Sequence, residues 1–200
     1  HRAGGIGHRV DVELERVLPV VRTLAGEDVC VSIDTRRAAV MRAALAAGAR
    51  IVNDITALAG AESLATVAQT GASVILMHMQ GEPRSMQRDP HYADVVREVY
   101  EYLEARIEAC MAAGIARERI AIDPGIGFGK TLDHNLALLR NLAMFHGLGC
   151  PLVLGVSRKS FIARLAGDAP PKERLAGSLA GALAGAGAGV QILRVHDVAE

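Results

Sequence analysis

Tryptophan is absent from this chain of 200 residues, and tyrosine and phenylalanine contribute three residues each. Proteins that bind single-stranded nucleic acids stack the bases on aromatic side chains, so this scarcity disfavours such a partner. The chain also lacks a net charge, because 22 basic residues balance 22 acidic ones. Nucleic-acid binding in general needs a basic face, which a neutral composition does not favour. We therefore expect no nucleic-acid partner.

Cysteine is scarce as well: Cys30, Cys110 and Cys150 lie far apart, without a Cys-x-x-Cys pair. An odd and dispersed set is typical neither of a disulfide framework nor of a zinc site, and it indicates reduced thiols. Residues 1–5 lack the apolar segment of a secretory signal peptide. These features predict a cytoplasmic protein.

One segment without charged residues, 175–193, is long enough to be tested as a membrane span. It consists mostly of glycine and alanine, whose transfer into a bilayer is weakly favourable, so we expect no membrane insertion. Gly177, Gly181, Gly185 and Gly189 recur at every fourth position. This spacing predicts a helix whose smooth face packs closely at a helix–helix contact, and that face is a candidate dimer interface. A strand should follow from about residue 190.

Short apolar runs alternate with stretches of helical period along the rest of the chain. The runs, which predict buried strands, are 29–33, 51–55, 74–79, 120–122, 152–156 and 192–195. The predicted helices are 12–24, 37–47, 61–70, 92–113 and 135–145, with C-terminal caps expected at Gly48, Gly71, Gly114 and Gly147. Alternation of this kind indicates an α/β protein with a parallel sheet.

A doubly wound sheet and a TIM (β/α)8 barrel both fit this alternation. Polar residues occur at or near the C-terminal end of every predicted strand, including Asp34, Asn53, Asp123, Lys159 and His196. A barrel gathers all its strand ends at one mouth, whereas a doubly wound sheet concentrates ligands at one point, so the barrel is favoured. Six β/α units are visible and a barrel needs eight. We therefore expect an incomplete barrel, a piece of a larger domain.

The polar residues divide by their chemistry. Taken singly, each has an ordinary explanation, such as a helix cap at Asp34 or a hydrogen-bonded core residue at His196. Together, two carboxylates, the Asn53 amide and the Lys159 ammonium suit a flat heterocycle with neighbouring donors and acceptors. Cationic side chains near residues 158 and 194–196, with a helix expected to start at 157–160, suit phosphate or carboxylate groups.

Five segments together resemble dihydropteroate synthase, a pterin-binding family. They are Ser-Ile-Asp-Thr at 32–35, Ile-Val-Asn-Asp-Ile at 51–55, Asp-Pro-Gly-Ile-Gly-Phe-Gly-Lys at 123–130, Gly-Val-Ser-Arg-Lys-Ser at 155–160 and Arg-Val-His-Asp at 194–197. The resemblance implies one pterin-binding TIM-barrel domain over residues 1–200. It also implies a homodimeric transferase of folate biosynthesis, which joins 6-hydroxymethyl-7,8-dihydropterin diphosphate to p-aminobenzoate with the help of Mg²⁺.

The resemblance assigns a role to each polar residue. Asp34 and Lys159 would be catalytic. The predicted pterin ligands are Asp34, Asn53, Asp123 and Lys159; the diphosphate ligands are Arg194 and His196; and the p-aminobenzoate ligands are Phe128, Lys130, Arg158 and Ser160. No metal ligand is expected in this chain, because the Asn-bearing loop that the family uses for magnesium has no counterpart here.

Two alternatives stay open. A methyltetrahydrofolate:corrinoid methyltransferase would share the acidic and Asn pterin ligands, but it would not require the segments at 157–160 and 194–197. A non-catalytic homologue that binds pterin is the other possibility.

Because the family's first two strand-end loops have no counterpart in these 200 residues, we expect the chain alone not to complete a catalytic cycle. A turnover assay that detects pyrophosphate release by the purified chain tests this. Full synthase activity would contradict it.

Overall fold

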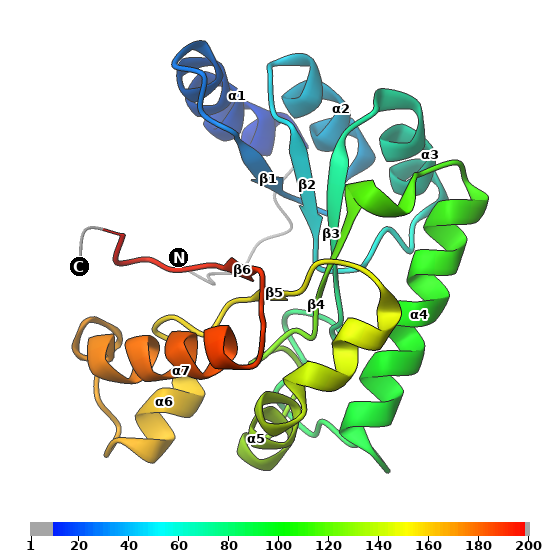
Figure 1. The fold of residues 1–200 in the computed structure, drawn as a ribbon. Coiled ribbons are helices and arrows are strands. Elements are labelled where there is room, and N and C mark those ends of the chain that lie inside the picture. The colour runs from blue at the N-terminus through cyan, green and yellow to red at the C-terminus, as the bar shows by residue number, and fades with distance from the viewer. Residues whose placement is uncertain (1–9, 199–200) are drawn as a thin grey trace. The chain divides into compact units, whose positions relative to one another are not determined.

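Short strands alternate with helices throughout residues 10–198, the part of the chain that the computed structural model describes (Figure 1). The elements are α1 (Val10–Gly26), β1 (Ser32–Asp34), α2 (Ala38–Ala46), β2 (Ile51–Asp54), α3 (Ala61–Thr70), β3 (Ser73–Met77), α4 (Val95–Ala112), β4 (Ile120–Asp123), α5 (Leu132–Arg140), β5 (Val153–Leu154), α6 (Ser160–Leu165), α7 (Leu175–Gly187) and β6 (Ile192–Leu193). Short 3-10 turns occur at Arg117–Arg119, Leu142–Leu148 and Pro171–Glu173. Each predicted strand overlaps an observed one, so the predicted alternation is confirmed.

The predicted helix 135–145 has the wrong boundaries. Helix α5 starts at Leu132, because the Thr131 hydroxyl accepts the backbone N–H of His134 in a capping box. The helix ends at Arg140 and is followed by a 3-10 segment. Gly147 lies inside that segment and does not cap it; Gly149 ends it with a left-handed φ of 67°. The predicted cap at Gly71 is confirmed, with φ 72° at the end of α3.

The described residues form two compact units. The first contains residues 10–76 and 106–120. Its strands are parallel, with Ile33 paired to Val52 and Val52 to Val74. Helix α2 contacts both α1 and α3, so the three helices lie side by side (Figure 1). Val40, Val52, Val67 and Val74 are fully buried, as expected for strands and helices that share one apolar core.

The second unit contains residues 77–105 and 121–198. The backbone N–H of His78 donates to the carbonyl oxygen of Asp123 at 3.1 Å, at the end of β4. Ile122 forms a parallel bridge with Leu152, just before β5. Strands β5 and β6 are parallel, with Val153 opposite Ile192. The C-terminal ends of β4, β5 and β6 therefore follow one another in this unit.

The glycine face of α7 packs inside the second unit. A Cβ atom added at Gly177 would collide with Cγ2 of Ile162 in α6, and one at Gly185 would lie 2.5 Å from Cδ2 of Leu154 in β5. The predicted close helix–helix contact is therefore confirmed, and the glycine face also contacts a strand. Because α6 and β5 of the same chain cover this face, the prediction that it forms a dimer interface is wrong. The opposite side of α7 exposes Leu179 and Leu183.

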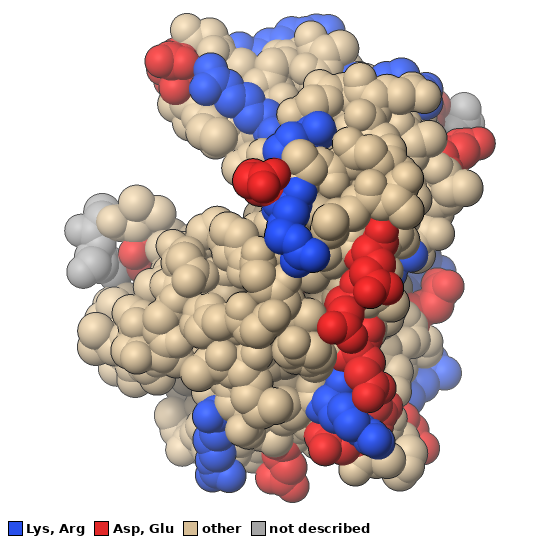
Figure 2. Space-filling model, turned by 45° about the vertical axis from the view of Figure 1, so that its right-hand side comes forward, with Lys and Arg blue, Asp and Glu red and all other residues tan. Residues whose placement is uncertain are grey.

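Charged side chains of both signs are spread among larger uncharged areas on the face that Figure 2 shows. Among residues 10–198, no helix combines the length and apolar character that a membrane crossing needs. The uncharged segment at 175–193 forms α7 and β6 instead of one continuous helix.

Gly177→Ala should lower the free energy of unfolding by about 1–3 kcal/mol, because the added methyl group overfills the space against buried Ile162. Gly187→Ala in the same helix is the matched control, since an added Cβ there meets nothing within 4 Å. The control should be neutral, or more stable by up to about 1 kcal/mol, because alanine favours the helix. Urea unfolding of both variants checks this; equal stability would contradict the close contact.

Candidate functional site

In the first unit, the ends of β1 and β2 bring together two predicted site residues. Asp34 and Asn53 are partners in the parallel ladder. The Asn53 side-chain amide donates to Oδ2 of Asp34 at 3.1 Å. Asp34 is exposed, whereas Asn53 is buried. The amide therefore holds an accessible carboxylate in one orientation.

The residue after Asn53 was not predicted as part of the site. Asp54 is fully buried and accepts the backbone N–H groups of Thr56 and Leu58. Burial raises the pKa of its carboxyl group, and these hydrogen bonds oppose the rise. Arg106 donates to the carbonyl oxygens of Ala57 and Leu58, which both have a left-handed φ. The Asn-Asp-x-Thr order is typical of an Asx turn and is the signal that could have identified this loop.

In the second unit, the loop between β4 and α5 carries the predicted residues Asp123 and Phe128. Oδ1 of Asp123 accepts the backbone N–H of Gly125 at 2.7 Å, which begins the loop. Gly125 has a φ of 71°, and an added Cβ would collide with the carbonyl oxygen of His78. Only glycine permits this close approach of two backbones.

Every backbone carbonyl from residue 125 to residue 129 accepts a hydrogen bond from a side chain. The donors are Lys130 to Gly125 and Phe128, Lys159 to Ile126, Gln87 to Gly127, and Tyr92 to Gly129. Neither Gln87 nor Tyr92 was predicted, because both come from the segment before α4 and no local pattern links them to this loop. The loop is thus fixed by four side chains instead of by strand partners.

The Lys130 ammonium lies inside this loop. Its Nζ is 3.0 Å from Nδ1 of His78 and 3.0 Å from each of the carbonyl oxygens of Gly125 and Phe128. Lys130 is 2% exposed. Burial lowers the pKa of Lys130 to about 7, although the charge of Asp123 opposes this. Burial and the neighbouring Lys130 charge lower the pKa of His78 to about 3, so its ring is neutral and Nδ1 accepts the hydrogen bond.

Lys159 lies between Asp123, which was predicted to bind the pterin, and Phe128, which was predicted to bind p-aminobenzoate. Its Nζ donates to the carbonyl oxygen of Ile126 and lies 4.8 Å from the centre of the Phe128 ring. Burial lowers the pKa of Lys159 to about 8, while the charge of Asp123 raises it. Burial raises the pKa of Asp123, and the charges of Lys159, Lys130 and Arg194 lower it. A buried carboxylate among three cations can pair with a ligand that donates hydrogen bonds.

The segments after β5 and β6 are joined by their side chains. Oγ of Ser157 is 3.0 Å from Nδ1 of His196 and also accepts the backbone N–H of that residue. The Arg158 guanidinium makes two hydrogen bonds to Asp197, of which the Nε–Oδ2 bond measures 3.0 Å. The prediction assigned Arg158 to p-aminobenzoate, but in this structure its guanidinium group is turned towards Asp197.

The predicted residues thus fall into two sets. Asp34 and Asn53 meet in the first unit. The second unit brings together Asp123, Phe128, Lys130, Lys159 and Arg194. Ser160, at the start of α6, is exposed and lines a small hollow together with Lys130 and Gln87. Among residues 10–198, no three His, Cys, Asp or Glu side chains gather as a metal site would require.

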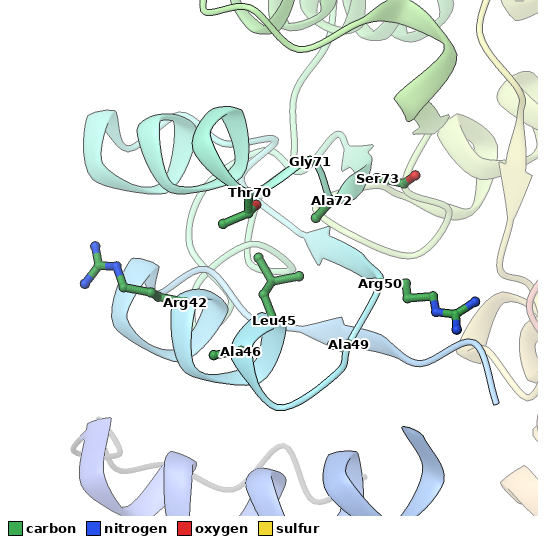
Figure 3. A pocket seen from close by; sticks show the side chains of 9 residues that line it. All are labelled: Arg42, Leu45, Ala46, Ala49, Arg50, Thr70, Gly71, Ala72 and Ser73. Atoms are coloured by element: carbon green, nitrogen blue, oxygen red, sulfur yellow. The ribbon is translucent and has the colours of Figure 1, made fainter. Parts of the chain in front are cut away.

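A larger hollow of about 590 Å³ lies in the first unit, at the opposite end of the strands. Its wall includes Leu45, Ala46 and Ala72, and it lies beside the residues that lead into β2 and β3 (Figure 3). Arg42 and Arg50 also line it, and their side chains extend in opposite directions (Figure 3). It contains none of the predicted site residues.

Known proteins resemble this chain in sequence and in fold over nearly all of its length. The chain is 48% identical over 200 residues to the dihydropteroate synthase of Escherichia coli K12 and covers 71% of that enzyme's length. The dihydropteroate synthase structure of Stenotrophomonas maltophilia matches 96% of this chain and 73% of its own, with a TM-score of 0.93 and 49% identity. That of Xanthomonas albilineans, solved with 7,8-dihydropteroate, matches 98% of this chain and 72% of its own, with a TM-score of 0.90 and 45% identity.

These neighbours confirm the predicted fold class, the (β/α)8 barrel, of which six strands lie in residues 10–198. The doubly wound alternative is thereby set aside. The family model described as "Pterin binding enzyme" matches residues 2–196. The chain therefore belongs to the pterin-binding enzymes, in the dihydropteroate synthase branch.

His78→Gln should flatten part of the pH dependence of stability. The unfolded chain protonates this histidine near 6.5 and the folded chain only near 3. Between these values the unfolded state binds more protons, so His78 contributes stability that is present above 6.5 and is lost as the pH falls towards 3. Glutamine does not titrate, and its side-chain oxygen can still accept the Lys130 hydrogen bond.

Urea unfolding at several pH values from about 7 to about 4 checks this. His91→Gln is the control, since that side chain is exposed, and it should follow the wild type. Equal losses of stability in the wild type and in His78→Gln would contradict the prediction.

Proposed function

We propose that the two sets of residues carry out the dihydropteroate synthase reaction of folate biosynthesis in the roles given below. The reaction joins 6-hydroxymethyl-7,8-dihydropterin diphosphate to p-aminobenzoate, giving 7,8-dihydropteroate and pyrophosphate. The observation that carries the assignment is the buried Asp123 carboxylate, with Lys159 beside it and the Phe128 ring against Lys159. The relative from X. albilineans was solved with 7,8-dihydropteroate and, in another structure, with 4-aminobenzoic acid.

Asp34, Asn53, Asp123 and Lys159 are proposed to bind the pterin. The aminopyrimidine edge of a pterin donates two neighbouring hydrogen bonds, and a buried carboxylate such as Asp123 accepts both. Asn53 offers an amide for the same edge. Lys159 would donate to acceptor atoms of the ring system. Each role uses a group that the described residues hold in a defined orientation.

Arg194 and His196 are proposed to bind the diphosphate. Both side chains are exposed at the end of β6, where an anionic ligand can reach them. Charge-assisted hydrogen bonds from a guanidinium and an imidazole are strong, and they would orient the leaving group.

Phe128, Lys130, Arg158 and Ser160 are proposed to form the p-aminobenzoate site. Phe128 offers its ring to the benzene ring, and the exposed Ser160 hydroxyl offers a hydrogen bond to the carboxylate. Lys130 would contribute indirectly: its ammonium donates a hydrogen bond to the carbonyl oxygen of Phe128 and so positions that residue. Arg158 would supply positive charge while it stays paired with Asp197.

The chemistry asked of these residues is electrostatic. In the proposed sequence the C–O bond to the diphosphate breaks first, and its electron pair leaves with pyrophosphate. The methylene cation is shared with the pterin ring until the aniline nitrogen forms the C–N bond and loses a proton. Asp34 stabilises the cationic ring, and Arg194 and His196 stabilise the departing anion; both effects strengthen as charge develops. No side chain has to form a covalent bond.

Mg²⁺ is proposed as the cofactor, where it would neutralise the diphosphate oxygens. The described residues do not fit a complete magnesium site, because no three acidic or imidazole side chains gather among them. No step above depends on the metal.

A homodimer and a cytoplasmic location are also proposed. Leu179 and Leu183 expose an apolar strip on α7, which supports an interface there. The three free thiols suit a reducing compartment.

The methyltransferase alternative is weaker. It requires only the pterin ligands and would not need the segments after β5 and β6. In this structure those two segments are joined by two side-chain contacts, Ser157–His196 and Arg158–Asp197. Binding of inorganic pyrophosphate distinguishes the two activities, since the methyltransferase has no diphosphate to bind.

Asp123→Asn should abolish pterin binding, with affinity falling by about 100-fold or more. The asparagine oxygen can keep the Gly125 hydrogen bond, so the loop should fold, but the amide group places a donor where the pterin also donates. The resulting loss of a buried charged hydrogen bond is about 3 kcal/mol. Asp133→Asn, at an exposed position nearby, is the matched control and should bind as the wild type does. Titration calorimetry with 6-hydroxymethylpterin measures both; unchanged affinity of Asp123→Asn would overturn the pterin assignment.

A further inference from the structure

Two side-chain pairs continue the β5–β6 ladder beyond its last strand residues. The ladder pairs Val153 with Ile192 and Leu154 with Leu193, a separation of 39 residues in each case. Ser157 and His196 are also separated by 39 residues, as are Arg158 and Asp197. The side chains therefore meet in the register of the strands, three and four residues after the strands end.

Ser157 contacts His196 at two atoms. Its Oγ accepts the backbone N–H of His196 at 3.2 Å and lies 3.0 Å from Nδ1 of the ring. Ser157 is 4% exposed, whereas His196 is exposed. A hydroxyl that accepts one hydrogen bond keeps its own hydrogen for donation. The ring nitrogen within reach is Nδ1, so the hydroxyl can donate to it.

The consequence concerns the other ring nitrogen. A neutral imidazole carries one hydrogen, and the nitrogen that accepts a hydrogen bond is the one without it. When Nδ1 accepts from Ser157, the hydrogen lies on Nε2. The exposed edge of His196 is then a hydrogen-bond donor, which is what an anionic oxygen requires.

We propose that Ser157 is a positioning residue for the leaving group: it sets the orientation and the Nε2–H tautomer of His196, so that the ring donates to the diphosphate. This inference rests on the proposed role of His196 in diphosphate binding.

The neighbouring Arg158–Asp197 pair helps to hold Ser157 in place. Arg158 has a left-handed φ of 58°, a conformation that needs stabilisation in a residue other than glycine. Its backbone N–H donates to Oγ of Ser178 in α7 at 2.9 Å, and its carbonyl accepts from Arg174 at 2.8 Å. Its guanidinium holds Asp197, next to His196. The residues that follow Ser157 and His196 are therefore held by hydrogen bonds, which supports a precise orientation of the His196 ring.

The test measures the tautomer and anion binding, and neither needs turnover. Histidine labelled with ¹⁵N shows which ring nitrogen carries the hydrogen, and signals that disappear in His196→Ala identify the residue. At a pH where the ring is neutral, the wild type should show the Nε2–H form. Ser157→Ala should lose this preference, and Ser157→Thr, which keeps the hydroxyl, should retain it. Ser85→Ala, at an exposed serine, is the control.

Calorimetry with inorganic pyrophosphate supplies the second readout. Ser157→Ala should weaken binding about tenfold, the effect of one hydrogen bond to a charged group. Ser157→Thr should restore it, and the affinity for 6-hydroxymethylpterin should not change. A general structural role of Ser157 would instead weaken both ligands or fail to be rescued by threonine.

Three results would overturn the inference. An Nδ1–H tautomer in the wild type does so without any variant. Wild-type pyrophosphate affinity in folded Ser157→Ala, while His196→Ala binds weakly, refutes the role of Ser157 alone. Equal affinities of wild type and His196→Ala refute the proposed diphosphate role of His196, and the inference with it.

Discussion

The second unit depends on one constraint: the five consecutive backbone carbonyl groups of residues 125–129 need hydrogen-bond donors. Residues 125–129 belong to no helix or strand, so no backbone ladder supplies donors to their carbonyl groups, although the Gly125 carbonyl oxygen also accepts the backbone N–H of Phe128 at 3.1 Å. Buried carbonyl groups without a partner are costly, and four side chains provide the donors. Two of these, Lys130 and Lys159, also lie beside Asp123. The same two lysines therefore donate hydrogen bonds to the loop backbone and place positive charge beside the candidate site.

Burial and charge act in opposite directions at this cluster. Burial raises the pKa of Asp123 and lowers those of both lysines, while the attraction between the acid and the two amines opposes each shift. A buried charge is tolerated when it is paired and hydrogen-bonded, and here the Asp123 carboxylate stabilises both ammonium groups, while the cations repel one another. The cluster with Arg194 has more positive than negative members, which suits a substrate that arrives with a diphosphate and leaves it behind.

Local sequence was enough to predict the elements whose signals are local. Helix α3 begins and ends where its apolar period and Gly71 predicted. Asp34 and Asn53 were both predicted at strand ends, but the hydrogen bond between them was not predicted and is known from the structure. The boundaries of α5 were wrong because the prediction did not use the Thr131–His134 capping box.

Contacts between distant segments could not be predicted in this way. The Gly-Lys pair at 129–130 indicated a lysine at a site surface, but the ammonium turns inward to His78, 52 residues earlier in the chain. No periodicity or spacing relates these two residues. The same holds for Gln87 and Gly127, which are 40 residues apart. The roles of individual polar residues could therefore be predicted only from the resemblance to a known family, whereas the fold class followed from the alternation of strands and helices along the sequence.

The packing around the glycine loop also limits how this enzyme can diverge. At Gly125 and Gly129 any larger residue would collide with the backbone of residues 78 and 80, and at Gly127 it would press on the Lys159 side chain. Ile126 is fully buried, so a change of its size would disturb the core, whereas Phe128 is half-buried. Evolutionary change in this part of the loop is thus easiest at Phe128, whose ring lies against Lys159.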